Sequence, residues 1–248
     1  MKAIRFSLLS LGLVPALGAT GPTPAAPNDC AKRVARAYEL LLETRQQQQG
    51  RILVARFLSE MAFTAPGQKK PQKNVAQFVL MARGSHTYLS DGKMDVYRDD
   101  EVQVCIVRPQ RVILVTPAEK QASSDLMPWF KMRDELLAQS QVQQCQVVAG
   151  KQGRYRRVLA LPKPNSSLSH KLVSVEYQLE ERTNEMRKMT MYYPKGYGAI
   201  SAGMTLQSQT WKAHDPAVDA PALSQVLGSD KKLLPAYRSF EFKDQRQN

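Results

Sequence analysis

Apolar and polar residues alternate with a period of two through most of this chain, and this pattern limits the fold more than any other feature. Across Leu53–Phe63 the apolar side chains alternate with polar ones such as Arg56 and Glu60. The alternation predicts a long strand with one buried face. Similar runs predict further strands at Val75–Arg83, His86–Ser90, Met94–Arg98, Val102–Val107, Arg111–Thr116, Val142–Ala149, Arg154–Leu161, Lys171–Glu180, Met186–Tyr193, Met204–Ala213 and Tyr237–Phe242.

Two stretches have helical spacing instead. Asn28 or Asp29 can cap a helix that runs to about Gln46, and a second helix is predicted over roughly Ser124–Gln139. About ten or eleven antiparallel strands with two helices predict an α+β, mainly β fold. We expect a curled antiparallel sheet, or incomplete β-barrel, covered by the helices. Residues 28–248 show no internal repeat or linker and are expected to form a single domain.

The N-terminus has the layout of a secretory signal peptide. Lys2 and Arg5 precede an apolar stretch from Phe6 to Leu17, and small residues follow up to Ala19. This order of charged, apolar and small residues predicts a signal peptide over residues 1–19. A flexible leader is expected over residues 20–27. The mature chain is therefore predicted to be an exported, soluble protein of the periplasm.

The chain is strongly basic, with 35 Lys+Arg against 22 Asp+Glu and a formal charge of +13. Export moves this charge into the cell envelope, so no nucleic-acid partner is expected. From Lys151 to Lys171 there are six basic residues and no acidic one. Such clusters favour peripheral contact with anionic lipid surfaces or with acidic partner proteins. A solvated basic face without a ligand is the alternative.

Motifs of catalysis are absent from the sequence. There is no Gly-x-Ser-x-Gly elbow, phosphate-binding loop, dinucleotide fingerprint or Cys-x-x-Cys pair. His86, His170 and His214 lack the paired spacing of a zinc site. We therefore expect a protein that is not an enzyme and has no catalytic residues, no metal and no cofactor.

The three cysteines leave two alternatives. Cys105 and Cys145 lie in predicted strands on either side of the second helix, so they can pair in an oxidising compartment. Buried free thiols are the other possibility. If they pair, Cys30 is left over, and the odd number prevents a firm assignment.

Methionine is abundant on the predicted strands, with ten in the chain. Because its side chain is flexible and polarizable, methionine-rich surfaces accommodate varied apolar ligands. Ordinary filling of a core is the alternative. A concave apolar sheet face needs either a ligand or a lid, since a large bare apolar patch is costly in water.

One hairpin carries a family resemblance. The segment Tyr88–Tyr97, with the sequence Tyr-Leu-Ser-Asp-Gly-Lys-Met-Asp-Val-Tyr, resembles the hydrophobic–Ser–Asp–Gly–Lys…Tyr hairpin of the LolA-like periplasmic carriers of outer-membrane lipoproteins. The family's Asn-Pro pair at the covering helix and its Arg-Pro-x-x-Phe element are not evident, although Arg83 can stand in for the strand arginine. The resemblance implies a carrier or chaperone that holds acyl chains of lipoproteins or lipids in an apolar cavity for delivery towards the outer membrane.

The same resemblance implies partners and a site. Transfer proteins of the inner and outer membranes would be the partners of a monomeric carrier. The cavity is expected to be lined by Leu53, Phe57, Met61, Phe78, Leu80, Val96, Val104, Met189, Met191 and Leu206, with Trp129 and Phe130 in the lid. A non-catalytic module that binds proteins, like the envelope-stress regulators of the same architecture, is the alternative. An enzyme with a dispersed site is a third.

Overall fold

The computed structural model describes residues 27–47, 50–64, 68, 70–118, 128–150 and 153–246. The predicted signal peptide over residues 1–19 lies outside the described residues, as does the predicted leader apart from Pro27. Pro27 is already the first residue of a helix. Among the described residues, no helix is both long enough and apolar enough to span a membrane.

The element order follows the sequence pattern closely. Two longer helices are α1 (Pro27–Gln47) and α2 (Pro128–Gln139), and α3 (Pro216–Asp219) is short. The strands are β1 (Ile52–Phe63), β2 (Gln72–Arg83), β3 (His86–Ser90), β4 (Met94–Arg98), β5 (Val102–Val107), β6 (Val112–Pro117), β7 (Ser140–Gly150), β8 (Gly153–Pro162), β9 (Ser174–Glu180), β10 (Met186–Tyr192), β11 (Ala199–Lys212) and β12 (Glu241–Asp244). Two 3₁₀ turns, Ala222–Gln225 and Pro235–Tyr237, precede β12.

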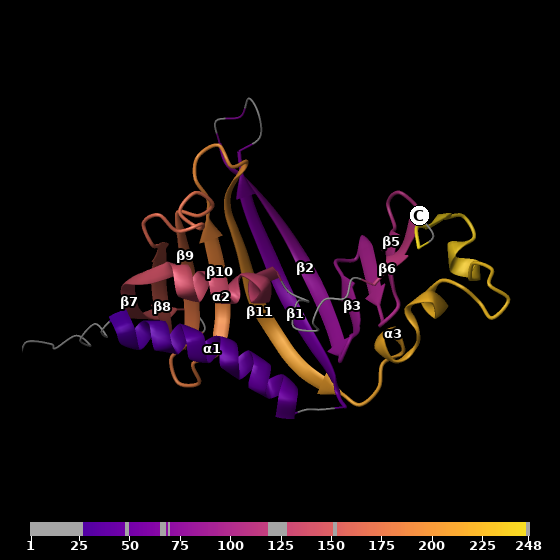
Figure 1. The fold of residues 1–248 in the computed structure, drawn as a ribbon, viewed down its shortest axis with the longest axis horizontal. Helices are drawn as coiled ribbons and strands as arrows, with labels where there is room; N and C mark the ends of the chain where they lie inside the picture. Colours follow the sequence, from indigo (N-terminus) through magenta and orange to yellow (C-terminus); the bar gives the residue numbers. More distant parts are fainter. Residues whose placement is uncertain are drawn as a thin grey trace, which may run out of the picture.

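All twelve strands belong to one open, curled sheet, as Figure 1 shows. Its strand order is β12-β6-β5-β4-β3-β2-β1-β11-β10-β9-β8-β7. Every pairing is antiparallel except that of β12 with β6, which is parallel. The predicted mainly β fold with a curled sheet is therefore confirmed. Each of the twelve strands overlaps a predicted range, so the total of about ten or eleven was too low, and β12 pairs in parallel instead of antiparallel.

The strand boundaries differ most from the prediction. β11 begins at Ala199, five residues before the predicted Met204, because its small residues pair with the end of β1. Tertiary pairing of this kind overrides weak local strand preference. β9 begins at Ser174, not Lys171, and Val173 is exposed instead of continuing the buried face.

The two faces of the sheet are covered in different places. We call the face against which α1 and α2 pack the inner face, and the opposite one the outer face. The inner core joins Tyr38 of α1 and Leu136 of α2 to strands that include β7–β11, the helix-covered half. Ala55 and Leu80 of the central strands also belong to this core. In Figure 1 both helices lie across this half of the sheet.

The other half is covered on the outer face. Register places Tyr88, Tyr97, Val104 and Val115 opposite one another across β3–β6, on the face opposite Leu80. This row packs against the C-terminal segment, which we define as residues 214–240, through apolar side chains of that segment. We call β3–β6 the segment-covered half. One sheet therefore carries two cores on opposite faces.

Candidate apolar binding site

A disulfide fixes α1 to the inner face of the sheet. Cys30 in the first turns of α1 is bonded to Cys145 of β7, with their Cα atoms 6.3 Å apart. Cys105 is free. The predicted alternative of a Cys105–Cys145 bond is therefore wrong. The reason is topological, because β5 and β7 lie near opposite edges of the sheet.

Tyr38 anchors the middle of α1. Its hydroxyl donates to Met189 Sδ at 3.4 Å, and its ring meets that of Tyr177 edge to face with centroids 6.3 Å apart. Burial raises the pKa of Tyr38 to about 12 and raises the pKa of Tyr177 well above its ordinary value. Both phenols are therefore neutral, and the floor under α1 has an apolar character. Asn184 adds a hydrogen bond from Nδ2 to the Arg33 carbonyl at 2.7 Å.

A cleft of about 620 Å³ opens between α1 and the inner face of β10 and β11. Its apolar lining comes from Ala37, Leu40, Met186, Leu206 and Trp211. Its polar lining comes from Thr183, Glu185, Arg187, Gln207, Ser208 and Gln209. The volume lies in the range of small-molecule sites, about 300–1,000 Å³. An apolar floor with a polar rim suits an amphiphile that has an apolar tail and a polar head.

A second, smaller cleft lies on the other side of α1. It encloses about 380 Å³ between α1, α2 and the strands β7 and β8. Val34, Leu136 and Val142 are apolar members of its lining, and Lys163 is its cation. The Lys163 ammonium donates to the Ala138 carbonyl at the end of α2 at 2.6 Å, so it stabilises the helix terminus.

The structure gathers most of the predicted lining residues on the inner face. Phe57, Phe78, Leu80, Met189, Met191 and Leu206 belong to the inner core. Leu53 lies on the same face of β1 as Phe57, Met61 pairs with Ala202 next to Met191, and Val96 pairs with Leu89, so all three also face the inner side of the sheet. Val104 is separated from them, because it faces the C-terminal segment on the outer face. Trp129 and Phe130 belong to α2, but their side chains lie outside the described residues.

Trp211 lines the main cleft, although the sequence pattern does not predict it there. Leu206 faces inwards, and since strand side chains alternate sides, an unbroken strand would place Trp211, five residues later, on the outer face. A β-bulge opposite Arg56 and Phe57 shifts the register, so that Leu206 pairs with Phe57 and Trp211 pairs with Leu53. A bulge reverses which residues face inwards. The alternating pattern contains no signal for it.

The outer face of the helix-covered half is polar. Lys188 Nζ lies 2.8 Å from the Glu60 carboxylate, and Lys73 pairs with the same group. Hydrogen bonds from Lys188 and Lys73 lower the pKa of Glu60 to about 2. Glu176, which is buried, pairs with Arg157 at 2.6 Å. These charges compensate one another across neighbouring strands, so the arrangement is that of a stabilised surface.

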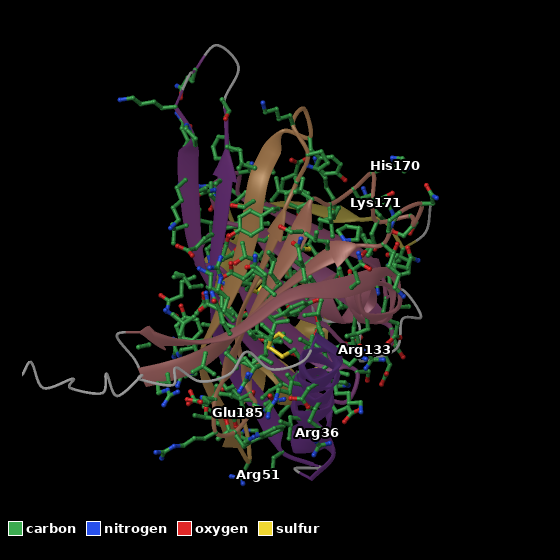
Figure 2. All side chains as sticks on the ribbon, turned by 90° about the vertical axis from the view of Figure 1, so that its left-hand side faces the viewer. Arg36, Arg51, Arg133, His170, Lys171 and Glu185 are labelled. Atoms are coloured by element: carbon green, nitrogen blue, oxygen red, sulfur yellow. A yellow bond between two sulfur atoms is a disulfide. The ribbon has the colours of Figure 1, made fainter. Side chains whose placement is uncertain are left out.

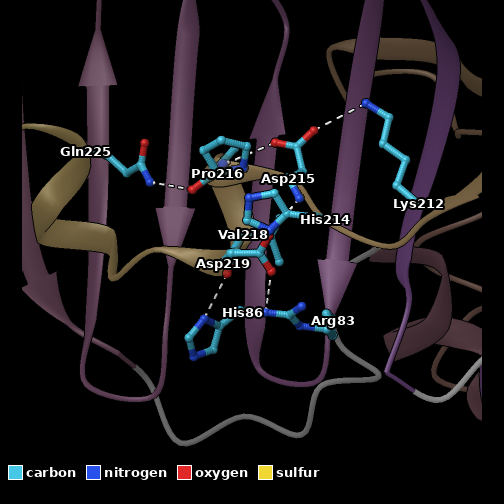
Figure 3. Close-up of polar contacts among 10 residues, drawn as sticks. Arg83, His86, Lys212, His214, Asp215, Pro216, Val218, Asp219 and Gln225 are labelled. Atoms are coloured by element: carbon cyan, nitrogen blue, oxygen red, sulfur yellow. Dashed lines mark hydrogen bonds and ion pairs between the residues drawn. The ribbon is translucent and has the colours of Figure 1, made fainter.

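Two of the three histidines meet at α3, as Figure 3 shows. His86 Nδ1 lies 3.0 Å from the Val218 carbonyl oxygen, and His214 pairs with Asp219. Arg83 pairs with the same carboxylate. These contacts fasten α3 to the sheet. Within the described part of the chain, no group of three His, Cys, Asp or Glu side chains is arranged to hold a metal ion.

No protein-family model and no curated protein matches the chain, but solved structures resemble it. An uncharacterized conserved protein from Thermus thermophilus aligns with 84% of this chain and 99% of its own, at 6% identity and a TM-score of 0.41. A LolA superfamily protein from Nitrosomonas europaea aligns with 72% of this chain and 94% of its own length, at 8% identity and a TM-score of 0.28. A chain of the Pseudomonas aeruginosa MucA/MucB complex aligns with 83% of this chain and 63% of its own length, at 15% identity and a TM-score of 0.36.

Proposed function

We propose that this chain is an exported, non-catalytic carrier that holds acyl chains of lipoproteins or lipids on the inner face of its sheet, for delivery towards the outer membrane. The observation that carries the proposal is the cleft beside α1. Its floor is formed by Met186, Leu206 and Trp211, and its rim holds Arg187 and Gln209. An acyl chain would lie along the floor while its polar head stays at the rim.

The energetics favour such a ligand. Each methylene group moved out of water contributes about 0.8 kcal/mol, so a few buried methylenes are enough to hold the tail. Because the disulfide and Tyr38 hold α1 on the sheet, the cleft keeps its shape without a ligand. A preformed site loses less conformational entropy on binding. Release would then depend on the head group and on the acceptor.

The test is a titration with cis-parinaric acid, a fatty acid whose fluorescence rises when it leaves water. Wild type should saturate. Leu206→Asp should raise the half-saturation concentration at least about tenfold, because a carboxylate in the floor is poorly solvated. Leu233→Asp is the matched control, since Leu233 is also partly buried but packs against the outer core.

A second variant guards against a folding defect. Gln209 pairs with the inner-facing Ala55 and is partly exposed at the rim of the cleft, so Gln209→Trp should fold and block the cleft by volume. Lack of binding by wild type would overturn the proposal. So would an equal loss of binding in Leu233→Asp.

A second candidate function, binding of an extended peptide from a protein partner, is favoured by the edge strand β7. β7 is the terminal strand of the sheet, and none of its eleven residues is charged or proline. Natural edge strands usually carry such residues to prevent pairing, and an unprotected edge can accept an additional strand. Gln144 and Gln146 are exposed on β7.

Native mass spectrometry of the chain isolated from the cell envelope distinguishes the two functions. A bound lipid supports the carrier. A stoichiometric polypeptide that is lost in the double variant Gln144→Lys, Gln146→Lys supports peptide binding at β7, because lysine on an edge strand opposes pairing. A polypeptide that remains bound to this variant would contradict binding at that edge.

A further inference from the structure

The exposed large apolar side chains of the described residues all lie at one end of the sheet. They are Met61, Val75, Val173, Tyr197 and Ile200, which we call the apolar tip. β1 and β10 end here, and β2, β9 and β11 begin here. In Figure 1 this is the upper end of the sheet, where β1 ends and β2 begins.

Pairing confirms that the members of the apolar tip are neighbours. Met61 pairs with Ala202 on β11 and lies on the inner face, whereas Val75 pairs with Glu60 and lies on the outer face at the same end of the sheet. Tyr193 donates its backbone N–H to Ile200, and Val173 donates its own to Tyr192. Tyr197 stacks on the Tyr193 ring with centroids 5.1 Å apart. The tip is therefore assembled from the ends of neighbouring strands and their connections, with Met61 on the inner face and Val75 on the outer face.

This surface continues into the inner core. Val175, Met191, Ala202 and Met61 form one row across β9, β10, β11 and β1 on the inner face. Val175 is fully buried, whereas Met61 is 45% exposed. The apolar floor of the sheet thus reaches solvent at the tip. A soluble protein rarely exposes a contiguous apolar patch unless that patch contacts a partner.

The charge around the apolar tip is positive. Two connections, residues 163–173 and 193–198, lie at this end, and neither contains Asp or Glu. Lys70, Lys171 and Lys195 are exposed at this end, and Figure 2 shows Lys171 with His170 at the upper right. Lys171 lies 3.8 Å from the Glu135 carboxylate of α2, whose side chain is partly exposed. Glu60, the nearest acidic residue on β1, is already compensated by Lys73 and Lys188.

We propose that the apolar tip docks on the surface of an anionic lipid bilayer. Exposed aliphatic and tyrosine side chains enter the head-group region, where amphipathic rings are favoured. The surrounding lysines contact the lipid phosphates. A protein partner that offered the same complementarity would need both an acidic rim and an apolar pocket, whereas every anionic bilayer presents both layers. The proposal is independent of the carrier function, because docking requires no ligand in the cleft beside α1.

The test is sedimentation of the full chain with vesicles of phosphatidylcholine and phosphatidylglycerol, against vesicles of phosphatidylcholine alone. Wild type should bind the anionic vesicles, and added salt should weaken this binding. The double variant Lys171→Glu, Lys195→Glu should bind at least about tenfold more weakly, since each lysine near such a surface contributes strongly to binding. All variants retain the same N-terminal residues, so differences between them report on the tip.

Two further variants complete the design. Lys32→Glu, Lys232→Glu makes the same change in charge at exposed lysines of α1 and the C-terminal segment, and it should retain most of the binding. Val173→Ser, Ile200→Ser should remove the binding that remains at high salt. The proposal is overturned if wild type does not bind anionic vesicles, or if the control pair loses as much binding as the tip pair. It is also overturned if the apolar variant binds like wild type. The cis-parinaric acid titration uses no bilayer, so failure of one proposal leaves the other testable.

Discussion

The helix-covered half and the segment-covered half solve the same problem in opposite ways. A strand with one apolar face must bury that face against another element. β7–β11 turn it towards α1 and α2 on the inner face, whereas β3–β6 turn it towards the C-terminal segment on the outer face. The side on which a sheet is covered is therefore a local property of its strands.

The switch of the covered face from inner to outer occurs at the central strands of the sheet. On β1, Ala55 faces the inner core while Ile52 and Val54 face α3 through Val218. The first four residues of β1 are buried on both faces, so this part of the strand reads as a continuous apolar run. Where the covered side of the sheet changes, the first residues of β1 therefore have neither side exposed to solvent.

The largest expected effect comes from a charge placed in the outer core. Val226 is fully buried in the C-terminal segment, so Val226→Asp should lower the free energy of unfolding by about 4 kcal/mol. Hydrogen exchange measured by mass spectrometry should show lost protection in β5 and β6. Unchanged protection around Tyr177 would show that the halves are separable, and equal loss in both would show that they unfold together.

Removal of the disulfide tests the helix-covered half. The double variant Cys30→Ser, Cys145→Ser should lose about 3 kcal/mol of stability, since the bond closes a loop of 115 residues. Urea denaturation with and without reductant measures the loss. Cys105→Ser, which removes a free thiol, should leave the midpoint nearly unchanged. A similar loss in this control would argue against the assigned pairing.

Asp95 tests the polar part of the segment-covered half. It is 2% exposed and accepts hydrogen bonds from Tyr88 at 3.1 Å and from Ser90 at 2.7 Å, and it pairs with Arg108. Asp95→Ala leaves these donors without their acceptor and should cost about 2 kcal/mol, as measured by thermal unfolding. A variant as stable as wild type would show that water replaces the carboxylate.

The smallest effect concerns pH and the outer face of the helix-covered half. The pKa of Glu60 is about 2 in the folded chain, below its ordinary value. Its ionised form therefore stabilises the fold above about pH 4.5, and this contribution is lost as the pH falls towards 2. After allowance for solvent screening it amounts to about 1 kcal/mol. Urea midpoints at pH 7 and pH 3 should differ less in Glu60→Gln than in wild type.

Local patterns predicted the strands well. The Asp91-Gly92 pair predicted the turn between β3 and β4 because Gly92 adopts a positive φ of 82° there. The register of β1 with β2 likewise follows from two long alternating runs. These turns and pairings are determined by residues close together in the sequence, so the sequence pattern alone can predict them.

Features that depend on distant elements were not predictable in the same way. Val104 alternates as regularly as Phe57, yet it faces the opposite core, because only the C-terminal segment decides which side of β5 is covered. The partner of Cys145 depends on the strand order, which places β7 beside α1 and far from β5. Trp211 reaches the cleft through a bulge. For the same reason, the candidate site was predicted as a set of inner-face residues but not as a cleft beside α1.

The pairing of β1 with β11 joins segments that are far apart in the sequence, and this affects how the chain folds. β1 to β6 form one run of neighbouring strands, β7 to β11 form another, and β1–β11 is the seam between them. During folding, one edge of the long apolar strand β1 stays unpaired until Ala199–Lys212, near the other end of the chain, pairs with it. Long-range pairings of this kind form late and expose the folding chain to aggregation. Protection of β1 during this interval, by a chaperone or by delayed folding, is therefore a requirement of this topology.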